Sequence, residues 1–205
     1  MKPNKILILL IMLSILGTFF VFNDLPDRIP THWNLKGEVD SYSGKSFAFF
    51  TAFLPLILYI LSLYLPKIDP KRQSYLKHKK AYEIVIMFIL LFLIMIHWAT
   101  ILFSLGYNLD ISTVVRWGVG LLFIVIGNYM GQIRHNYFFG IKLPWTLANE
   151  TVWRKTHRVG GFGFIVVGLI FILTSSIISF ISLIVLVIGL GVYSYIEFKK
   201  LESKS

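Results

Sequence analysis

The most constraining feature of the sequence is residues 159–196, a stretch of 38 residues without Asp, Glu, Lys, Arg or His. As one helix it would be about 57 Å long at about 1.5 Å per residue. The hydrocarbon core of a bilayer is only about 30 Å thick. The stretch therefore predicts two membrane-spanning helices that fold back on each other, with the turn in the polar residues 174–179.

Four further apolar runs satisfy the same length criterion, which brings the predicted spans to six. They are residues 6–22, 47–65, 84–105 and 117–133. Hydrophobic residues make up 56% of the chain and charged residues 15%, against roughly 45–50% and about 25% in soluble domains. We predict an all-α integral membrane protein that crosses the cell membrane several times. The first run lacks a small-residue cleavage site at its end, so we expect it to be retained as a helix.

The basic residues predict the orientation of the spans. With six spans and a cytoplasmic N-terminus, 16 Lys and Arg fall inside and three, Arg28, Lys36 and Lys45, fall outside, while Arg116 lies at the outer border. This asymmetry is what the positive-inside rule requires, so both termini are predicted to be cytoplasmic. It also accounts for the net charge of +10, and direct binding to nucleic acid need not be invoked.

The spans and loops divide the chain into six parts. We expect an N-terminal two-helix unit with an ordered extracellular loop at 24–46, a basic cytoplasmic loop, helices three and four, a cytoplasmic polar segment, a C-terminal helical hairpin and a cytoplasmic tail. The predicted bounds are 1–66 for the two-helix unit, 67–82 for the basic loop and 83–131 for helices three and four. They are 132–161 for the polar segment, 162–198 for the hairpin and 199–205 for the tail.

The predicted outer loop carries the first group of unusual residues. Pro26 and Pro30 favour extended backbone before them, and residues 34–37 have the composition of a turn. We expect a short strand or hairpin on the membrane surface. Two interpretations stay open: a structural cap anchored by Trp33, or a loop that contacts a ligand. A metal site at His32, Glu38 and Asp40 is disfavoured because no known ligand spacing is present.

The second group lies on the predicted cytoplasmic side, in residues 128–161. Thr146 or Asn149 can cap a short helix whose first turn holds Glu150. Helical spacing aligns Glu150 with Trp153, Arg154 and His157 on one face, with Glu150 and Arg154 at the favourable i,i+4 spacing. This face suits a protein partner or a polar network with Asn128 and Arg134, although basic residues here also serve topology and anionic lipid.

Two polar residues are predicted inside or at the ends of spans. His97 lies in the third span, where a neutral ring bonded to a neighbouring helix is favoured over a proton relay. Asn128 lies in the fourth span, between two glycines of a Gly127-xxx-Gly131 pattern that is typical of helix packing.

Two motifs give a family resemblance. The outer-loop pattern Pro26, Ile29, Pro30, His32, Trp33, Asn34, Gly37, Asp40 after a first membrane helix resembles an N-terminal domain of unknown function, DUF1648, of bacterial membrane proteins. The pattern from Gly140 to Gly161, with Pro144-Trp145-Thr146, Asn149-Glu150, Trp153 and His157-Arg158, resembles the signature of the SdpI family. Lys142 stands where the family pattern has Arg, and an ammonium cannot reproduce the bidentate contacts of a guanidinium.

The resemblance implies a non-enzymatic protein, without cofactor or metal, that protects a Gram-positive producer cell from a secreted membrane-active peptide toxin. It further implies that an ArsR-type repressor is held at the cytoplasmic side, and anionic lipid is a third expected partner. The candidate residues on the toxin side are Pro30, His32, Trp33, Asn34, Gly37 and Asp40. The candidates on the cytoplasmic side are Lys142, Pro144, Trp145, Thr146, Asn149, Glu150, Trp153, Arg154, His157 and Arg158.

Two other classes of function have less support in the sequence. A small transporter or channel would need more ionisable residues in its spans than His97, Glu83 and Arg116. An enzyme would need a catalytic motif, and neither a zinc-protease pattern, a nucleophile elbow nor a phosphate loop is present.

Overall fold

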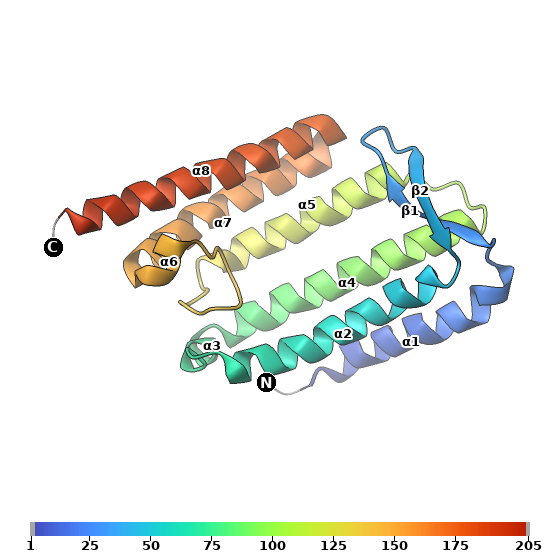
Figure 1. The fold of residues 1–205 in the computed structure, drawn as a ribbon, viewed down its shortest axis with the longest axis horizontal. Coiled ribbons are helices and arrows are strands. Elements are labelled where there is room, and N and C mark those ends of the chain that lie inside the picture. The colour runs from blue at the N-terminus through green and yellow to red at the C-terminus, as the bar shows by residue number, and fades with distance from the viewer. Residues whose placement is uncertain (1–2, 204–205) are drawn as a thin grey trace. The chain divides into compact units, whose positions relative to one another are not determined.

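The computed structural model describes residues 3–203, which form six long helices, short helices and one two-stranded sheet (Figure 1). The elements in chain order are α1 (Lys5–Val21), η1 (Phe22–Asp24), β1 (Arg28–Trp33), β2 (Val39–Gly44), α2 (Phe47–Ile68), α3 (Gln73–Lys77), α4 (Lys79–Ser104), α5 (Ile111–Met130), α6 (Pro144–Ala148), α7 (Glu150–Leu173) and α8 (Ser176–Glu202).

The long helices have the length and composition of membrane spans. Each of α1, α2, α4, α5, α7 and α8 contains a strongly apolar window, and large apolar side chains such as Phe20, Phe162 and Leu173 lie exposed on them. Such surfaces are costly in water but match lipid, and a helix satisfies its own backbone polar groups. The predicted class, an all-α membrane protein with six spans, is confirmed. Which side each terminus occupies remains a prediction.

The chain forms two compact units. The first comprises the described residues up to Leu63 together with Ile86–Gly118, and the second comprises Tyr64–Val85 and the described residues from Val119 onward. In the first unit Leu7, Ile11 and Ile15 of α1 pack with Ala52 of α2 and Leu90 of α4. Asn4 caps the helix α1, because its side chain accepts the amide N–H groups of Ile6 and Leu7.

His97 joins three helices of the first unit. Its Nε2 lies 2.9 Å from the Thr18 hydroxyl of α1, and its Nδ1 lies 2.8 Å from the Thr51 hydroxyl of α2. The side chain is buried, so both ring nitrogens have partners away from water. His97 is thus bonded to two neighbouring helices, and the neutral state of its ring stays a prediction.

The predicted outer loop is an antiparallel hairpin with an irregular register. Arg28 pairs with Gly44 at one end, Trp33 pairs with Val39 at the other, and the pairing shifts on both sides of His32. The hairpin is held to the helices by Leu25 and Ile29, which are buried in a cluster with Ala48 of α2 and Ile101 of α4. The loop is therefore ordered, as its prolines predict.

In the second unit, glycines bring α5 and α7 into backbone contact. A Cβ atom placed on Gly120 would lie 2.7 Å from the Gly168 carbonyl oxygen, and one on Gly127 would lie 2.5 Å from the Gly161 carbonyl oxygen. Both pairs are seven residues apart in their helices, which repeats the contact every two turns. Gly131, the other member of the predicted packing pattern, has no atom within 4 Å of such a Cβ.

One boundary of the second unit differs from the sequence prediction and another agrees with it. The short cytoplasmic helix that we expected after Asn149 is continuous with the fifth span, because α7 runs unbroken over 24 residues. No Gly or Pro in that sequence imposes an end, and the paired glycines Gly160 and Gly161 pack within the helix. The turn between the last two spans lies at Thr174 and Ser175, inside the predicted range.

Candidate functional site

The hairpin presents a polar surface built on a fixed turn. Asn34 closes the turn: its side-chain oxygen accepts the amide N–H groups of Lys36 and Glu38, and its side-chain nitrogen donates to the Glu38 carboxylate. Gly37 adopts φ +84°, a conformation that disfavours other residues. Asn34 and Gly37 thus have structural roles that support the surface next to them.

His32 and Asp40 form the exposed polar pair of this hairpin. His32 Nδ1 lies 2.5 Å from Asp40 Oδ1 across the two strands, and the side chains are 67% and 43% exposed. Neither is needed to fill the core, so the pair is free to contact a ligand. Trp33 instead lies edge-on against Phe103 of α4 with ring centroids 5.8 Å apart, and Pro30 is buried. Among residues 3–203, no group of three His, Cys, Asp or Glu side chains could hold a metal.

The segment between α5 and α6 folds over a buried hydrogen-bond cluster in the second unit. Asn136 is fully buried; its side-chain oxygen accepts from the amides of Phe138 and Phe139, and its side-chain nitrogen donates to the carbonyls of Arg134 and Phe139. Each hydrogen-bonding position of the amide is used, so the loop has one defined conformation.

The cluster extends to the loop after α2. Asp69 is buried, and its carboxylate accepts from the amides of Lys71 and Tyr137 and lies 3.1 Å from the Tyr75 hydroxyl. That hydroxyl also lies 3.1 Å from Asn136. Burial and the neighbouring Asp69 carboxylate raise the pKa of Tyr75, so the phenol stays protonated as a donor.

Two histidines complete the cluster from its outer side. The Nδ1 atom of His78 accepts the amide N–H of Arg134 at 3.2 Å, and burial followed by the Arg134 charge lowers the pKa of His78 to about 4. Lys71 donates to Nδ1 of His135 at 2.6 Å, and burial together with Lys71 lowers the pKa of His135. Both rings are therefore neutral near pH 7.

The first turns of α7 pack against the segment between α5 and α6. His157 is buried; its Nδ1 lies 2.9 Å from the Trp153 carbonyl, and its Nε2 accepts the amide N–H of Ile141 at 2.9 Å. The Trp153 ring stacks on His157 with centroids 4.0 Å apart, and its indole N–H donates to the Ile133 carbonyl. A Cβ on Gly140, at φ +124°, would collide with both rings.

The structure divides the predicted cytoplasmic partner residues into two sets. Five are used inside the protein: Trp145 donates to Ser194 of α8, Thr146 bonds to the backbone around Leu143, Asn149 caps α7, and Trp153 and His157 are buried as described. The five that face outward are Lys142, Pro144, Glu150, Arg154 and Arg158.

The four residues of the predicted face lie along one side of α7 but differ in exposure, because Glu150 and Arg154 are exposed whereas Trp153 and His157 are buried. That the exposed residues hold a partner stays a prediction. Trp153 is 0% exposed, because its ring packs against His157 and His135 and its indole N–H has a buried partner in the Ile133 carbonyl. Glu150 and Arg154 form no ion pair in the described chain. Asn128 is exposed and takes no part in the cluster, and the hydrogen bonds of Arg134 to the cluster come from its backbone.

Sequence reasoning missed the partners that complete this cluster: Asp69, Tyr75, His78, His135 and Asn136. The first three stand in the loop that reads as a solvated basic run, because lysines surround them. The available signal was an Asp-Pro pair at residues 69–70 and a Tyr and a His among the lysines, which solvation alone does not require.

Comparisons with known proteins agree with both motifs. The SdpI/YfhL protein family matches residues 132–195, and a domain of unknown function, DUF1648, matches residues 8–59. A curated relative, the immunity protein SdpI of Bacillus subtilis (strain 168), is 31% identical over 170 residues, which cover 83% of this chain and 80% of the relative. No solved structure matches the chain.

Proposed function

Because this chain belongs to the SdpI/YfhL protein family, we propose that it is an immunity protein that protects its cell from a secreted, membrane-active peptide toxin. The observation that carries the proposal is the similarity to an immunity protein along most of both chains. The six spans place it in the cell membrane as a multi-pass protein. Protection by contact requires no catalytic group, and we propose that the protein acts without catalysis.

The hairpin is the surface that we assign to the toxin. Its base is fixed to α2 and α4 through Leu25 and Ile29, while His32, Asp40 and Tyr42 are exposed above it. A rigid polar surface with an exposed aromatic ring binds a peptide at low entropic cost. The basic-residue asymmetry supports an extracellular position for this hairpin.

Survival assays test this assignment. A Bacillus subtilis strain that lacks its own SdpI and expresses this chain is grown beside its toxin-producing parent. His32→Ala and Asp40→Ala should lower survival at unchanged membrane abundance, because both side chains are exposed and support no core contact. Lys36→Ala on the same turn is the matched control. Full survival of both variants would reduce the hairpin to a structural cap.

The cytoplasmic half of the proposal is that the exposed side of the 131–158 region holds an ArsR-type repressor at the membrane. The outward-facing residues Glu150, Arg154 and Arg158 follow one another along α7, and Arg is among the residue types that dominate protein interfaces. Arg154→Ala with Arg158→Ala should release a fluorescently labelled repressor from the membrane without loss of the protein. Trp153 is unsuitable for this test, since truncation of its buried side chain would leave a cavity and destabilise the protein.

A phosphatase fusion tests the side on which these surfaces lie. A phosphatase fused after the C-terminus should stay in the cytoplasm, so no phosphatase activity should be found outside the cell. Activity there would contradict both assignments, because the hairpin and the 131–158 region would change sides.

A further inference from the structure

The strand β2 has an outer edge that faces away from β1. In an antiparallel pair, opposite residues alternate between those that exchange backbone hydrogen bonds and those that do not. Asp27 and Lys45 are of the bonded kind, because the Lys45 amide donates to the Asp27 carbonyl at 2.9 Å. The register then makes Ile29 with Ser43 the next bonded pair. Gly44, which lies between these positions on β2, therefore points its N–H and C=O groups outward.

Tyr42 continues this outer edge on the other side of Ser43. Tyr42 and Gly44 are exposed, and the exposed surface of a glycine is its backbone. Within the part of the chain that the structure describes, no backbone group of residues 39–44 forms a hydrogen bond outside the hairpin. The N–H and C=O groups of both residues are therefore open to a further strand.

The outer edge of β1 is protected where that of β2 is open. Pro30 pairs with Tyr42 in the register, so it occupies an outward position on β1. A proline there has no N–H to donate to another strand, and proline is one of the residues that block sheet edges. Pro30 is also buried. Residues 39–44 contain neither Pro nor Lys. The open edge of this hairpin is thus the edge of β2.

The open edge is short, which bears on what it can bind. The pairing shifts on both sides of His32, so the regular part of β2 is limited to residues 42–44. A stable complex between two copies of a protein buries at least about 1,200 Å², and an edge with two outward residues contributes little of that. An extended peptide needs only such an edge, and neighbouring side chains add contacts.

We propose that the toxin peptide binds to the hairpin as a third strand, through the backbone of Tyr42 and Gly44. This inference rests on the proposed immunity function and states how the hairpin would hold the peptide. Main-chain hydrogen bonds supply affinity for many peptide sequences, and cross-strand side chains supply specificity. The exposed ring of Tyr42 favours an apolar or aromatic side chain beside it on the added strand.

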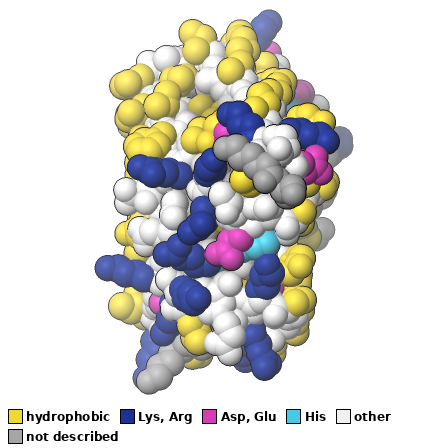
Figure 2. Space-filling model, turned by 90° about the vertical axis from the view of Figure 1, so that its left-hand side faces the viewer, with side chains coloured by type: hydrophobic (Ala, Val, Ile, Leu, Met, Phe, Trp, Pro, Cys, Tyr) yellow, Lys and Arg dark blue, Asp and Glu magenta, His cyan; other side chains and the backbone are white. Residues whose placement is uncertain are grey.

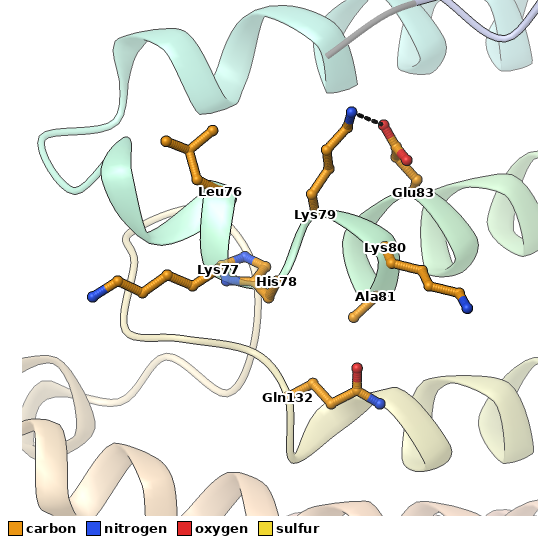
Figure 3. A pocket seen from close by; sticks show the side chains of 8 residues that line it. All are labelled: Leu76, Lys77, His78, Lys79, Lys80, Ala81, Glu83 and Gln132. Carbon is orange, nitrogen blue, oxygen red and sulfur yellow. Dashed lines mark ion pairs between the residues drawn. The ribbon is translucent and has the colours of Figure 1, made fainter.

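A hollow of about 460 Å³ at the start of α4 is a poorer site for such a peptide. Figure 2 shows Lys and Arg side chains spread over the face at the left of Figure 1, where α3 is labelled. The positive-inside rule predicts that this side is cytoplasmic, out of reach of a secreted peptide. Figure 3 shows that the side chains of Lys77, Lys79 and Lys80 point in different directions, so they do not converge on one ligand.

Hydrogen exchange of single amides tests the third strand directly. The full chain is placed in nanodiscs, and the probe is the killing peptide purified from the medium of the toxin-producing Bacillus subtilis parent. Exchange is followed by NMR. With saturating peptide, the amides of Tyr42 and Gly44 should exchange at least about tenfold more slowly than in the free chain, because a hydrogen bond must open first. The amide of Arg28, outward on β1, should exchange equally fast in both states.

A proline at position 42 tests the same bonds in the survival assay. Tyr42→Pro removes the outward N–H, whereas the bonds to β1 come from Ser43 and Lys45 and remain. Tyr42→Thr is the matched control, since it also removes the ring but keeps the N–H and suits a strand. The peptide concentration that halves growth should be about threefold to tenfold lower for Tyr42→Pro than for Tyr42→Thr, as expected for one lost hydrogen bond. Slow exchange of the Ser43 and Lys45 amides in Tyr42→Pro checks that the hairpin still forms.

The outcomes separate this inference from the function on which it rests. If the parent chain neither protects cells nor binds the peptide, the proposed function fails and the third strand with it. If the parent chain protects while the Tyr42 and Gly44 amides stay fast, or while both variants at position 42 survive alike, only the third strand is wrong. Slow exchange of these amides before peptide is added, in discs that hold two copies, would assign the edge to a second copy and overturns the proposal as well.

Discussion

Replacement of Gly127 by Ala should weaken the packing of α5 on α7. The added Cβ would lie 2.5 Å from the Gly161 carbonyl oxygen, whereas ordinary contacts begin at 3.4 Å. The helices would have to separate by close to 1 Å because the atom that is met belongs to the backbone. Such overpacking costs about 1–3 kcal/mol. Alanine recovers about 0.5–1 kcal/mol as the better helix former, so a net loss of about 1 kcal/mol, and at most about 2.5 kcal/mol, is expected.

Gly131 is the matched control for this prediction. It follows α5 directly, and its added Cβ would meet nothing within 4 Å. Gly131→Ala should therefore leave the free energy of unfolding within about 0.5 kcal/mol of the parent. Unfolding by dodecyl sulfate in mixed micelles, followed by circular dichroism, measures both variants.

Gly161→Ala tests the same contact from α7, because its Cβ would lie 2.8 Å from the Gly127 carbonyl oxygen. The two substitutions open one gap, so the double variant should lose less than the sum of the single losses. Equal stability of the Gly127 and Gly131 variants, or additive losses in the double variant, would refute the backbone contact.

Three further predictions concern single side chains. Burial lowers the pKa of His78 to about 4, so the unfolded state binds more protons than the folded state between pH 6.5 and 4. The free energy of unfolding should therefore fall by on the order of 2–3 kcal/mol as the pH is lowered from 6.5 to 4. His78→Asn should flatten this dependence of stability on pH. Asn149→Ala should cost about 1 kcal/mol through loss of the α7 cap, whereas Ser175→Ala, at an α8 cap without a side-chain bond, should cost nothing measurable. His97→Leu should cost only about 1 kcal/mol in the same micelle assay, because Thr18 and Thr51 keep hydrogen bonds to their own helices; a collapse of folding would contradict this.

The sequence predicts the spans well because lipid imposes a length and a hydropathy that each segment satisfies by itself. It predicts the hairpin because Pro26, Pro30 and the Asn34–Gly37 turn act locally. Helical spacing also places Glu150, Trp153 and His157 correctly along α7. Which of them is buried depends on the loop after α5, and spacing carries no information about that loop.

The buried cluster could not be predicted for the same reason. Asn136 and Asp69 are 67 residues apart in the chain, and the Tyr75 hydroxyl joins them only when the α2–α3 loop and the 131–149 segment meet. Isolated polar residues in basic loops are typical of solvated surface. Only the three-dimensional contacts distinguish a side chain that is hydrogen-bonded inside the protein from one that is exposed and could bind a partner.

The outer surface of α8 has a consequence for how such a chain can diverge over time. Ile181, Val185, Ile188 and Val192 are exposed along it, while Ser194 and Leu190 face the protein. Lipid chains conform to any apolar shape, so selection on the outward positions acts on hydropathy and hardly on shape. Deep mutational scanning should find these positions freely exchangeable among Leu, Ile, Val and Phe and closed to charge. Much of the sequence can therefore drift while the residues that pack inward preserve the fold.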